Sequence, residues 1–356
     1  MRIAAVLGTR PEIIRLSRVI EGLDRHCELV LVHTGQNFDP ALSDVFFDEL
    51  GVRAPDRYLG ITGEGFAHRV GGILAAAGPL FEELEPDKLL VLGDTDSALS
   101  AYVAKRMGIP VFHMEAGNRC FDDRVPEEVN RRVIDHSSDL LMPYTGRSRD
   151  NLLREGIHPS RIIVTGNPIK EVMDHHVDQI TASAALENLG LEDGGYLLIT
   201  VHRQETVDFE DRLRSLLRGA AAGADDLGLP LIFSVHPRTR ARLEQFGISL
   251  EDEHVRPYEP FGFFDFVSLE SHARCVLTDS GTVQEECCIM GVPTVTVRDT
   301  TERPETIECG SNVLSGTDPD AIRRCLRLMV EESRSWEPPP EYLIDAVSGT
   351  VMNVLL

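Results

Sequence analysis

Three short stretches carry most of the residues in this chain that could do chemistry. They are residues 8–12 (GTRPE), 113–117 (HMEAG) and 278–281 (TDSG). Each lies where an apolar run ends and a helical pattern begins, and in an open parallel sheet ligands bind at the carboxyl ends of the strands. The first supplies an arginine, the second a carboxylate and the third a helix start that can hold phosphate. This combination predicts a nucleotide-linked substrate whose diphosphate is made to leave.

The third stretch predicts the phosphate site. Ser280, Gly281 and Thr282 stand between a strand and a helix expected over 283–290. Unpaired N–H groups and the positive end of the helix dipole attract a diphosphate there, and a glycine lets the backbone approach closely. Glu286, one turn further in, could accept hydrogen bonds from both hydroxyls of a ribose. The alternative is an ordinary capped helix, since Asp or Ser before a helix is common.

Cationic side chains follow other strands. Arg10 could reach a leaving phosphate with its planar fork, or it could simply pair with Glu12. His202 and Arg203 end the first strand of the second half, and His236 follows the next strand. A single histidine is more often structural, but a His-Arg pair that faces a cleft can serve proton transfer and anion binding.

Three carboxylates are candidates for acid–base work. Asp94 follows the apolar run 89–92, and Glu115 follows the run 111–114. Glu127 opens a helix, where an acid is normally only a partner of the dipole. Asp94 and Glu115, which follow two different strands, are stronger candidates for a catalytic role, because both would face one cleft. Crowded carboxylates raise one another's pKa, which lets a glutamate carry protons near neutrality.

The elements that must position these side chains alternate between strand and helix. Apolar runs dense enough for strands buried on both faces recur through the chain. They are 3–7, 29–33, 89–92, 111–114, 140–143 and 162–165 in the first half, and 196–201, 231–235, 276–278 and 294–297 in the second. Helical patterns separate them, including 40–50, 97–107, 170–191 and a last amphipathic helix over 341–356. This alternation predicts an α/β fold with two doubly wound, Rossmann-like domains.

The pattern restarts after a boundary near residues 167–180. We therefore expect an N-terminal domain over 1–168 and a C-terminal domain over 169–340, with the helix 341–356 packing back on the first domain. Two such domains that face each other create a cleft lined by strand ends, and substrates commonly bind at domain interfaces of this kind.

The composition narrows the classes of function. Lys and Arg total 35 against 58 Asp and Glu, a formal net charge of −23, and only three residues are lysine. So acidic a chain is a poor candidate for binding nucleic acid or an anionic membrane, and it would suit a cytosol rich in salt. Seven scattered cysteines without a CxxC pair, and no apolar stretch near the ~20 residues of a membrane span, predict a soluble, reduced, cytoplasmic protein.

Signatures of other chemistries are missing from the sequence. No GxGxxG follows the first strand, which weakens an NAD interpretation. HExxH and GxSxG are absent, and His113-Met114-Glu115 matches only half of a zinc-deaminase signature. We therefore expect neither a cofactor nor a metal.

Many ordered motifs together resemble the non-hydrolysing UDP-N-acetylglucosamine 2-epimerase family. The match spans nearly the whole chain: GTRPE at 8–12, GDT at 93–95, HMEAG at 113–117, PEEVNR at 126–131, TGN at 165–167, HR at 202–203, TDSG at 278–281, QEE at 284–286 and TERPE at 301–305. The resemblance implies the GT-B type of fold, in which the second domain binds UDP, and a homodimer. It also implies inversion of C2 of a UDP-2-acetamido sugar, by elimination of UDP to a 2-acetamidoglycal and re-addition.

The resemblance also implies the site residues. By position, Asp94, Glu115 and Glu127 resemble the catalytic acids and bases of the family, and His202 is implied to lie near the diphosphate. The resemblance leaves open which carboxylate removes the proton and which returns it. The residues implied to bind the substrate or UDP are Arg10, Arg15, Arg131, Arg203, His236, Ser280, Gly281, Thr282, Glu286 and Arg303. The chain departs from the family at Arg15, where Lys is frequent, and at Thr282, where a second Gly is usual. The stretch 33–39 also differs from the Gln-His-Arg version of enzymes with an allosteric site, which argues against allosteric activation here.

Two segments favour a particular branch of the family. Residues 112–122, with Asn118 in place of the usual Leu, and residues 11–19 are similar to the branch that converts UDP-2-acetamido-2,6-dideoxy-L-talose to UDP-N-acetyl-L-fucosamine. The alternative is a UDP-GlcNAc/UDP-ManNAc 2-epimerase. Other classes remain as rivals: a GT-B glycosyltransferase, a hydrolysing epimerase and a sensor of nucleotide sugars without catalysis.

Overall fold

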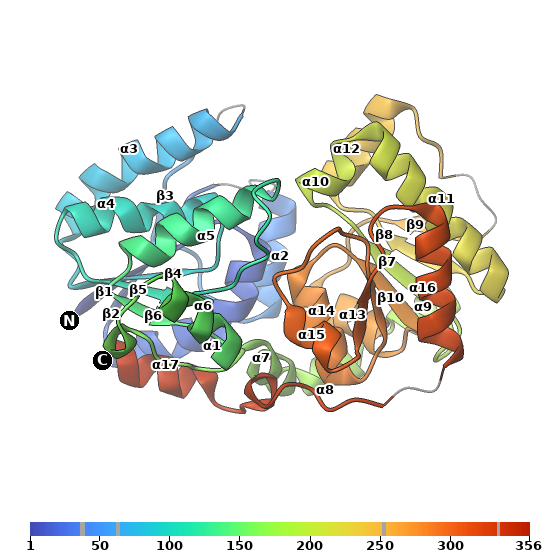
Figure 1. The fold of residues 1–356 in the computed structure, drawn as a ribbon. Coiled ribbons are helices and arrows are strands. Elements are labelled where there is room, and N and C mark those ends of the chain that lie inside the picture. Colours follow the sequence, from blue (N-terminus) through green and yellow to red (C-terminus); the bar gives the residue numbers. More distant parts are fainter. Residues whose placement is uncertain (36–39, 62–64, 251–253, 333–334) are drawn as a thin grey trace. The chain divides into compact units, whose positions relative to one another are not determined.

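The computed structural model describes residues 1–35, 40–61, 65–250, 254–332 and 335–356 (Figure 1). It divides into two compact units. The first comprises Met1–His175 with Pro340–Leu356, and the second His176–Pro339. The stretch 33–39, on which the expectation about allosteric activation depends, lies partly outside the described residues.

The first unit is built on a parallel sheet of six strands in the order β3-β2-β1-β4-β5-β6. The strands are β1 Arg2–Leu7, β2 Glu28–His33, β3 Arg57–Tyr58, β4 Lys88–Leu92, β5 Val111–Met114 and β6 Leu140–Met142. The helices and 3-10 turns are α1 Arg10–His26, α2 Pro40–Glu49, α3 Phe66–Leu84, η1 Asp96–Leu99, α4 Ser100–Arg106, α5 Pro126–Ser137, α6 Gly146–Arg154, η2 Pro159–Arg161, α7 Ile169–His175, η3 Pro340–Leu343 and α17 Val347–Leu355. The chain order reverses between β1 and β4, which is where such sheets bind ligands.

The second unit repeats this architecture, with a parallel sheet in the order β12-β11-β10-β7-β8-β9. The strands are β7 Leu197–Thr200, β8 Leu231–Ser234, β9 Val255–Tyr258, β10 Cys275–Thr278, β11 Thr294–Thr296 and β12 Asn312–Leu314. The helices are α8 Val177–Thr181, α9 Ala185–Leu189, α10 Gln204–Val207, α11 Glu210–Leu227, α12 Pro237–Phe246, α13 Phe263–Ser271, α14 Gly281–Met290, α15 Pro304–Glu308 and α16 Pro319–Glu331. Here the order reverses between β7 and β10.

Burial explains why the central strands read as continuous apolar runs. In β1 every residue after Arg2 is buried, because helices cover both faces of the sheet. Ala4 lies beside Val30 of β2 and Leu89 of β4 in the parallel register. The α/β fold predicted from this alternation is confirmed.

The edges of the sheets differ from the prediction. The expected strand 162–165 is wrong: Ile162 makes an isolated bridge to Leu141, and Ile163 N and Thr165 N still donate to β6 and its end at 2.9 and 3.0 Å. The chain then turns at Gly166 (φ +88°), so no regular strand extends. The edge strands β3, β9 and β12 were missed, since edge strands are short and partly exposed and lack the buried apolar signal.

Two helical predictions also need correction. The segment 170–191 forms three short helices, α7, α8 and α9, instead of one. The last helix begins at Val347, after the 3-10 turn η3, and not at residue 341. It packs along α1 (Figure 1), where Met352 lies so close to Gly22 that a Cβ there would be 2.2 Å from its sulfur. The C-terminal segment therefore completes the first unit.

Within the described ranges, none of the helices has the length and apolarity needed to cross a membrane. In the same part of the chain, no group of three or more His, Cys, Asp or Glu side chains is arranged to hold a metal ion.

Candidate active site

The loop after β1 is held by a buried carboxylate. Oε2 of Glu12 accepts hydrogen bonds from the backbone N–H of Gly8 (2.9 Å) and of Thr9 (2.8 Å), and from the Thr9 hydroxyl (2.8 Å). Its Oε1 accepts from the hydroxyl of Thr95, in the loop after β4, at 2.9 Å. Burial nevertheless raises the pKa of Glu12 to about 7. Glu12 thus ties the ends of β1 and β4 together across the point where the strand order reverses.

Arg10 does not pair with Glu12, so that alternative is wrong. In the described part of the chain its guanidinium has no ion pair, and it lies over the ring of Phe46 at 5.5 Å from the centroid. Burial lowers the pKa of Arg10, because a guanidinium in a low-dielectric site lacks the hydration that favours its charge. An anion that approaches the end of β1 would restore that stabilisation.

Glu115 is the residue that directly follows β5, and it adopts a left-handed conformation with φ +65°. Its Oε2 accepts from Nη1 of Arg15 and, at 3.4 Å, from the hydroxyl of Tyr144. The Arg15 guanidinium lies 5.7 Å from the centroid of the Tyr144 ring. Asn118 Nδ2 donates to the other carboxylate oxygen at 3.3 Å. A non-glycine residue in this region of φ and ψ is uncommon and costs on the order of 1–3 kcal/mol, which functional sites often tolerate.

The turn that aims Glu115 depends on its neighbours. The backbone N–H of Glu115 donates to Met142 O at 3.1 Å, and that of Gly117 donates to Asp135 Oδ2 at 3.2 Å. Gly117 itself has φ +80°, and a Cβ there would lie 2.3 Å from the carbonyl oxygen of Ser148. Only glycine fits at position 117, and the turn it allows sets the direction of the preceding carboxylate.

A buried network of charged side chains also supports the turn that contains Glu115 and Gly117. Nδ1 of His113 lies 2.9 Å from Asp135 Oδ1, and Arg119 Nη2 lies 2.8 Å from Asp135 Oδ2. Burial by itself would raise the pKa of Asp135, but hydrogen bonds and charge from His113 and Arg119 outweigh it and lower the pKa. His113 belongs to the partial zinc-deaminase signature. Both of its ring nitrogens are within hydrogen-bond distance of protein oxygens, with Nδ1 near Asp135 Oδ1 and Nε2 at 2.8 Å from the carbonyl oxygen of Gly93.

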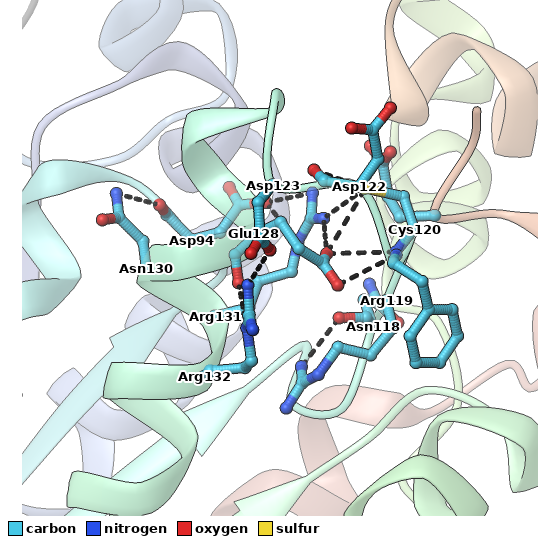
Figure 2. A network of polar contacts seen from close by, with 12 residues as sticks. Asp94, Asn118, Arg119, Cys120, Asp122, Asp123, Glu128, Asn130, Arg131 and Arg132 are labelled. Atoms are coloured by element: carbon cyan, nitrogen blue, oxygen red, sulfur yellow. Dashed lines mark hydrogen bonds and ion pairs between the residues drawn. The ribbon is translucent and has the colours of Figure 1, made fainter. Parts of the chain in front are cut away.

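Asp94 follows β4 and is held by Arg131 of α5 (Figure 2). Arg131 donates through Nε to Asp94 Oδ2 at 2.8 Å and through Nη1 to Glu128 Oε2 at 2.8 Å. Glu128 in turn accepts the backbone N–H groups of Cys120 and Phe121, each at 3.0 Å. Arg131, expected to bind substrate, is therefore placed between two carboxylates.

Glu127 lies on the first turn of α5, half-buried and one residue before Glu128. The next residue, Glu128, accepts hydrogen bonds from Arg131 and from the backbone N–H of Cys120. Sequence reasoning singled out Glu127, so the supporting role of Glu128 was missed. A signal for it does exist, because Glu128 and Arg131 stand at i and i+3 on one helix.

In the second unit, Asp279 organises the end of β7. It is fully buried, and its carboxylate accepts the backbone N–H of His202 at 2.9 and 3.0 Å and that of Arg203 at 2.9 Å. Burial raises the pKa of Asp279 even though these backbone hydrogen bonds and the charge of Arg203 act to lower it. Sequence reasoning used Asp279 only as a helix-start signal and missed this role.

The two histidines expected at strand ends lie together. The rings of His202 and His236 lie with their centroids 5.0 Å apart, tilted by 30° to each other. His236 also caps α12, because its Nδ1 accepts the backbone N–H of Arg238 at 3.1 Å. Both therefore sit at the carboxyl ends of the adjacent strands β7 and β8.

The start of α14 offers its N–H groups without a side-chain cap, since Ser280 makes no capping hydrogen bond. Gly281 permits close packing there: a Cβ would lie 2.9 Å from Oε1 of Glu302 and 3.3 Å from Cζ of Arg303. Arg303 donates through Nε to Glu285, one turn after Gly281. The structure thus places Arg303 beside the helix start but pairs it with a glutamate.

Thr282 and Glu286 form the neighbouring row of α14, because they too are four residues apart. Thr282 is half-buried and Glu286 is 3% exposed. Nη2 of Arg203 lies 3.3 Å from Oε1 of Glu302, and Glu302 also pairs with Arg298 at 2.8 Å. These contacts lie within the second unit.

The two doubly wound sheets, with ligand-type residues at the carboxyl ends of their strands, define a two-domain α/β enzyme of the GT-B type. The sequence model of the family described as UDP-N-acetylglucosamine 2-epimerase matches residues 22–356. The chain belongs to this family, whose members are isomerases, and the resemblance seen in the sequence is confirmed.

Individual relatives agree with that assignment. The UDP-N-acetylglucosamine 2-epimerase of Methanocaldococcus jannaschii is 37% identical over 350 residues, 95% of each chain. Its crystal structure in complex with UDP-GlcNAc and UDP matches with a TM-score of 0.95 at 35% identity, over 100% of this chain and 99% of that one. A UDP-2,3-diacetamido-2,3-dideoxy-D-glucuronate 2-epimerase of Pseudomonas aeruginosa is 35% identical over 327 residues, 90% of each chain.

Proposed function

We propose that this enzyme interconverts UDP-N-acetylglucosamine and UDP-N-acetylmannosamine by inverting C2 of the sugar. The observation that carries the proposal is the strained Glu115 at the end of β5, whose carboxylate is held by Arg15 and Tyr144. A carboxylate fixed in this way suits proton transfer at a carbon. The Methanocaldococcus relative, with its UDP-GlcNAc complex, supports the identity of the substrate.

The relatives favour this substrate over the L-talose nucleotide expected from residues 112–122 and 11–19. Asn118 was one of the residues behind that expectation, and its contacts offer a different reason for the residue. Its Nδ2 donates to Glu115 Oε1 at 3.3 Å, and its Oδ1 accepts from the hydroxyl of Ser148 at 2.7 Å. Asn118 is thus suited to hold the glutamate, a role that is independent of which sugar is bound.

The proposed mechanism divides the work between the two units. The C2 proton is not made acidic by a neighbouring carbonyl, so departure of UDP must assist its removal. In the first unit, Asp94, Glu115 and Glu127 would take and return the proton, while Arg10 would stabilise the leaving diphosphate. Re-addition of UDP to the 2-acetamidoglycal, with protonation from the opposite face, would give the epimer.

In the second unit, the start of α14 at Ser280, Gly281 and Thr282 would hold the diphosphate, with Arg203 and the His202–His236 pair nearby. Glu286 would accept the ribose hydroxyls. Arg131 and Arg303, which pair with carboxylates in the structure, would act by supporting Asp94 and the start of α14. Arg15 would act on Glu115 in the same way.

The proposal is tested by incubating the purified protein with UDP-GlcNAc in D2O without any acceptor and following the products by NMR. We expect UDP-ManNAc with deuterium at C2. A glycosyltransferase would give no new nucleotide sugar without an acceptor, a hydrolysing epimerase would release free sugar, and a sensor would leave the substrate unchanged. A parallel incubation with the L-talose nucleotide decides between the branches, and Glu115→Gln is the control that should lose turnover.

A further inference from the structure

Glu270, near the end of α13, is a buried carboxyl group without a partner that could stabilise its charge. The residue is 0% exposed, and among the described residues no N–H or O–H group of another residue donates to either of its carboxyl oxygens. No described Arg, Lys or His forms an ion pair with it. An ionised carboxylate in such a place would cost several kcal/mol. The burial of this carboxyl group without a counter-charge therefore needs an explanation.

The polar group that acts on Glu270 is the carboxyl of Glu286, on the adjacent helix α14. Burial, followed by the charge and hydrogen bonding of Glu286, raises the pKa of Glu270 well above its ordinary value. Two carboxylates side by side in an apolar site cannot both ionise, so one proton is shared between them. Because the pKa of Glu270 is raised well above its ordinary value, Glu270 keeps the proton and can donate a hydrogen bond.

The other ionisable groups around the pair do not replace this proton. Tyr196 uses its hydroxyl to donate to Leu269 O at 2.5 Å, and its pKa is raised by burial. Burial also raises the pKa of the Cys287 thiol, the neighbour of Glu286 in α14. The helices α8 and α9 pack on α13 as well, and among the described residues they bring no ionisable side chain that acts on Glu270.

We propose that Glu270 is a positioning residue that, as a neutral acid, donates a hydrogen bond to Glu286 and orients its carboxylate toward the ribose hydroxyls of the bound nucleotide. The inference rests on the proposed function, in which the start of α14 holds the diphosphate. Glu286 lies on the row that begins with Thr282, about 6 Å along the helix axis at ~1.5 Å per residue. That offset fits a ribose next to a diphosphate held at the helix start.

In this arrangement Glu270 donates to one side of the Glu286 carboxylate, and the two neighbouring hydroxyls of a bound ribose donate to it from the nucleotide side. The pair would thus distinguish a ribonucleotide from its 2′-deoxy analogue, because the analogue leaves a buried acceptor without a donor. The distinction would fade when Glu270 loses its proton, since repulsion would then push the Glu286 carboxylate away.

The test measures the dissociation constants of UDP and 2′-deoxy-UDP by titration calorimetry at pH values from 6 to 9. Glu270→Met keeps the size of the side chain but removes the donor, and we expect it to weaken UDP binding about tenfold while the affinity for 2′-deoxy-UDP barely changes. Glu270→Gln keeps an N–H donor, so it should retain the preference for UDP, and it should also abolish the alkaline loss of affinity seen in the wild type.

The inference is overturned if Glu270→Met binds both nucleotides as the wild type does, or if Glu270→Gln loses the preference as completely as Glu270→Met. Glu286→Gln separates this failure from that of the proposed function. If Glu286→Gln removes the preference for UDP and Glu270→Met does not, only the role of Glu270 is wrong. If Glu286→Gln leaves the preference intact, the assignment of the ribose site to Glu286 is wrong and the inference falls with it.

Discussion

Nη2 of Arg131 lies 2.6 Å from Oδ2 of Asp94, and the two side chains are largely buried (Figure 2). The same guanidinium pairs with Glu128, which holds the backbone at Cys120 and Phe121. Arg131 therefore links the acid at the end of β4 to the loop after β5. The proposed proton-transfer residues from two strands depend on one cation from α5.

Replacing Arg131 by Met should destabilise the protein by about 3–5 kcal/mol, because both carboxylates would stay buried without a counter-charge. Turnover should fall as well, since Asp94 would lose its position. Urea unfolding and the NMR assay measure the two effects. Arg132→Met is a matched control: its partner Asp123 is exposed, so the change should cost less than about 1 kcal/mol. Equal losses for the two variants would contradict the prediction.

Asp279→Asn should weaken UDP binding and lower stability by about 1–3 kcal/mol. The carboxylate accepts the N–H groups of His202 and Arg203 with both of its oxygens, and an amide offers only one acceptor to the same donors. Calorimetry with UDP and thermal unfolding would measure the effects. Asp318→Asn serves as the control, because Asp318 caps α16 through one exposed hydrogen bond to Ala321 N and Asn caps equally well. An Asp279→Asn variant as stable as the control would refute the prediction.

Glu12 should make stability depend on pH in a direction opposite to that of a salt-bridged acid. Its pKa is raised from 4.5 to about 7 in the folded state, so the folded protein binds more protons than the unfolded chain between those values. The contribution of Glu12 to stability is therefore fully present below about pH 4.5 and is lost as the pH rises through about 7. The shift corresponds to about 3 kcal/mol at most.

Glu12→Gln removes this titration while an amide oxygen can still accept from Gly8 N and Thr9 N. Relative to the wild type, the variant should gain stability between pH 5 and pH 8, as measured by urea unfolding at each pH. Glu12→Ala is the control that loses the acceptor altogether, and it should be less stable than Glu12→Gln at every pH. A constant difference between wild type and Glu12→Gln across this range would exclude the predicted linkage.

The parts of the site that sequence reasoning found share one property. Arg10, Asp94, Glu115 and Ser280 each stand within a few residues of a strand end, and an apolar run followed by a polar residue is a local pattern. The central strands were predictable for the same reason, because burial on both faces makes their sequence continuously apolar.

What the sequence could not show are partners that only the fold brings together. Asp279 and His202 are 77 residues apart along the chain. Nothing in the local pattern at either residue indicates that the carboxylate bonds to the distant backbone. Glu270 is a similar case, because a glutamate near the end of a helix is expected on the surface and only the packing of α13 against neighbouring helices buries it. The edge strands were missed because their short, exposed sequences lack an apolar signal.

Gly117 and Gly156 provide a last prediction, on the turn that aims Glu115. Both have a left-handed backbone, with φ +80° and +86°, so alanine is strained at either position. A Cβ at Gly156 meets nothing within 4 Å, whereas one at Gly117 would lie 2.3 Å from Ser148 O and 2.8 Å from Leu152 Cγ. Gly156→Ala should cost about 1–2 kcal/mol with normal turnover.

Gly117→Ala carries the same strain and must also displace the backbone of α6, because the carbonyl oxygen of Ser148 cannot rotate away as a side chain could. We expect a loss of stability at least ~2 kcal/mol greater than for Gly156→Ala, together with a large fall in kcat, since Glu115 would no longer meet Arg15 and Tyr144. Urea unfolding and the NMR assay on both variants measure these effects. If the two alanine variants lose equal stability and keep equal turnover, the close approach of Gly117 to α6 does not set the direction of the glutamate.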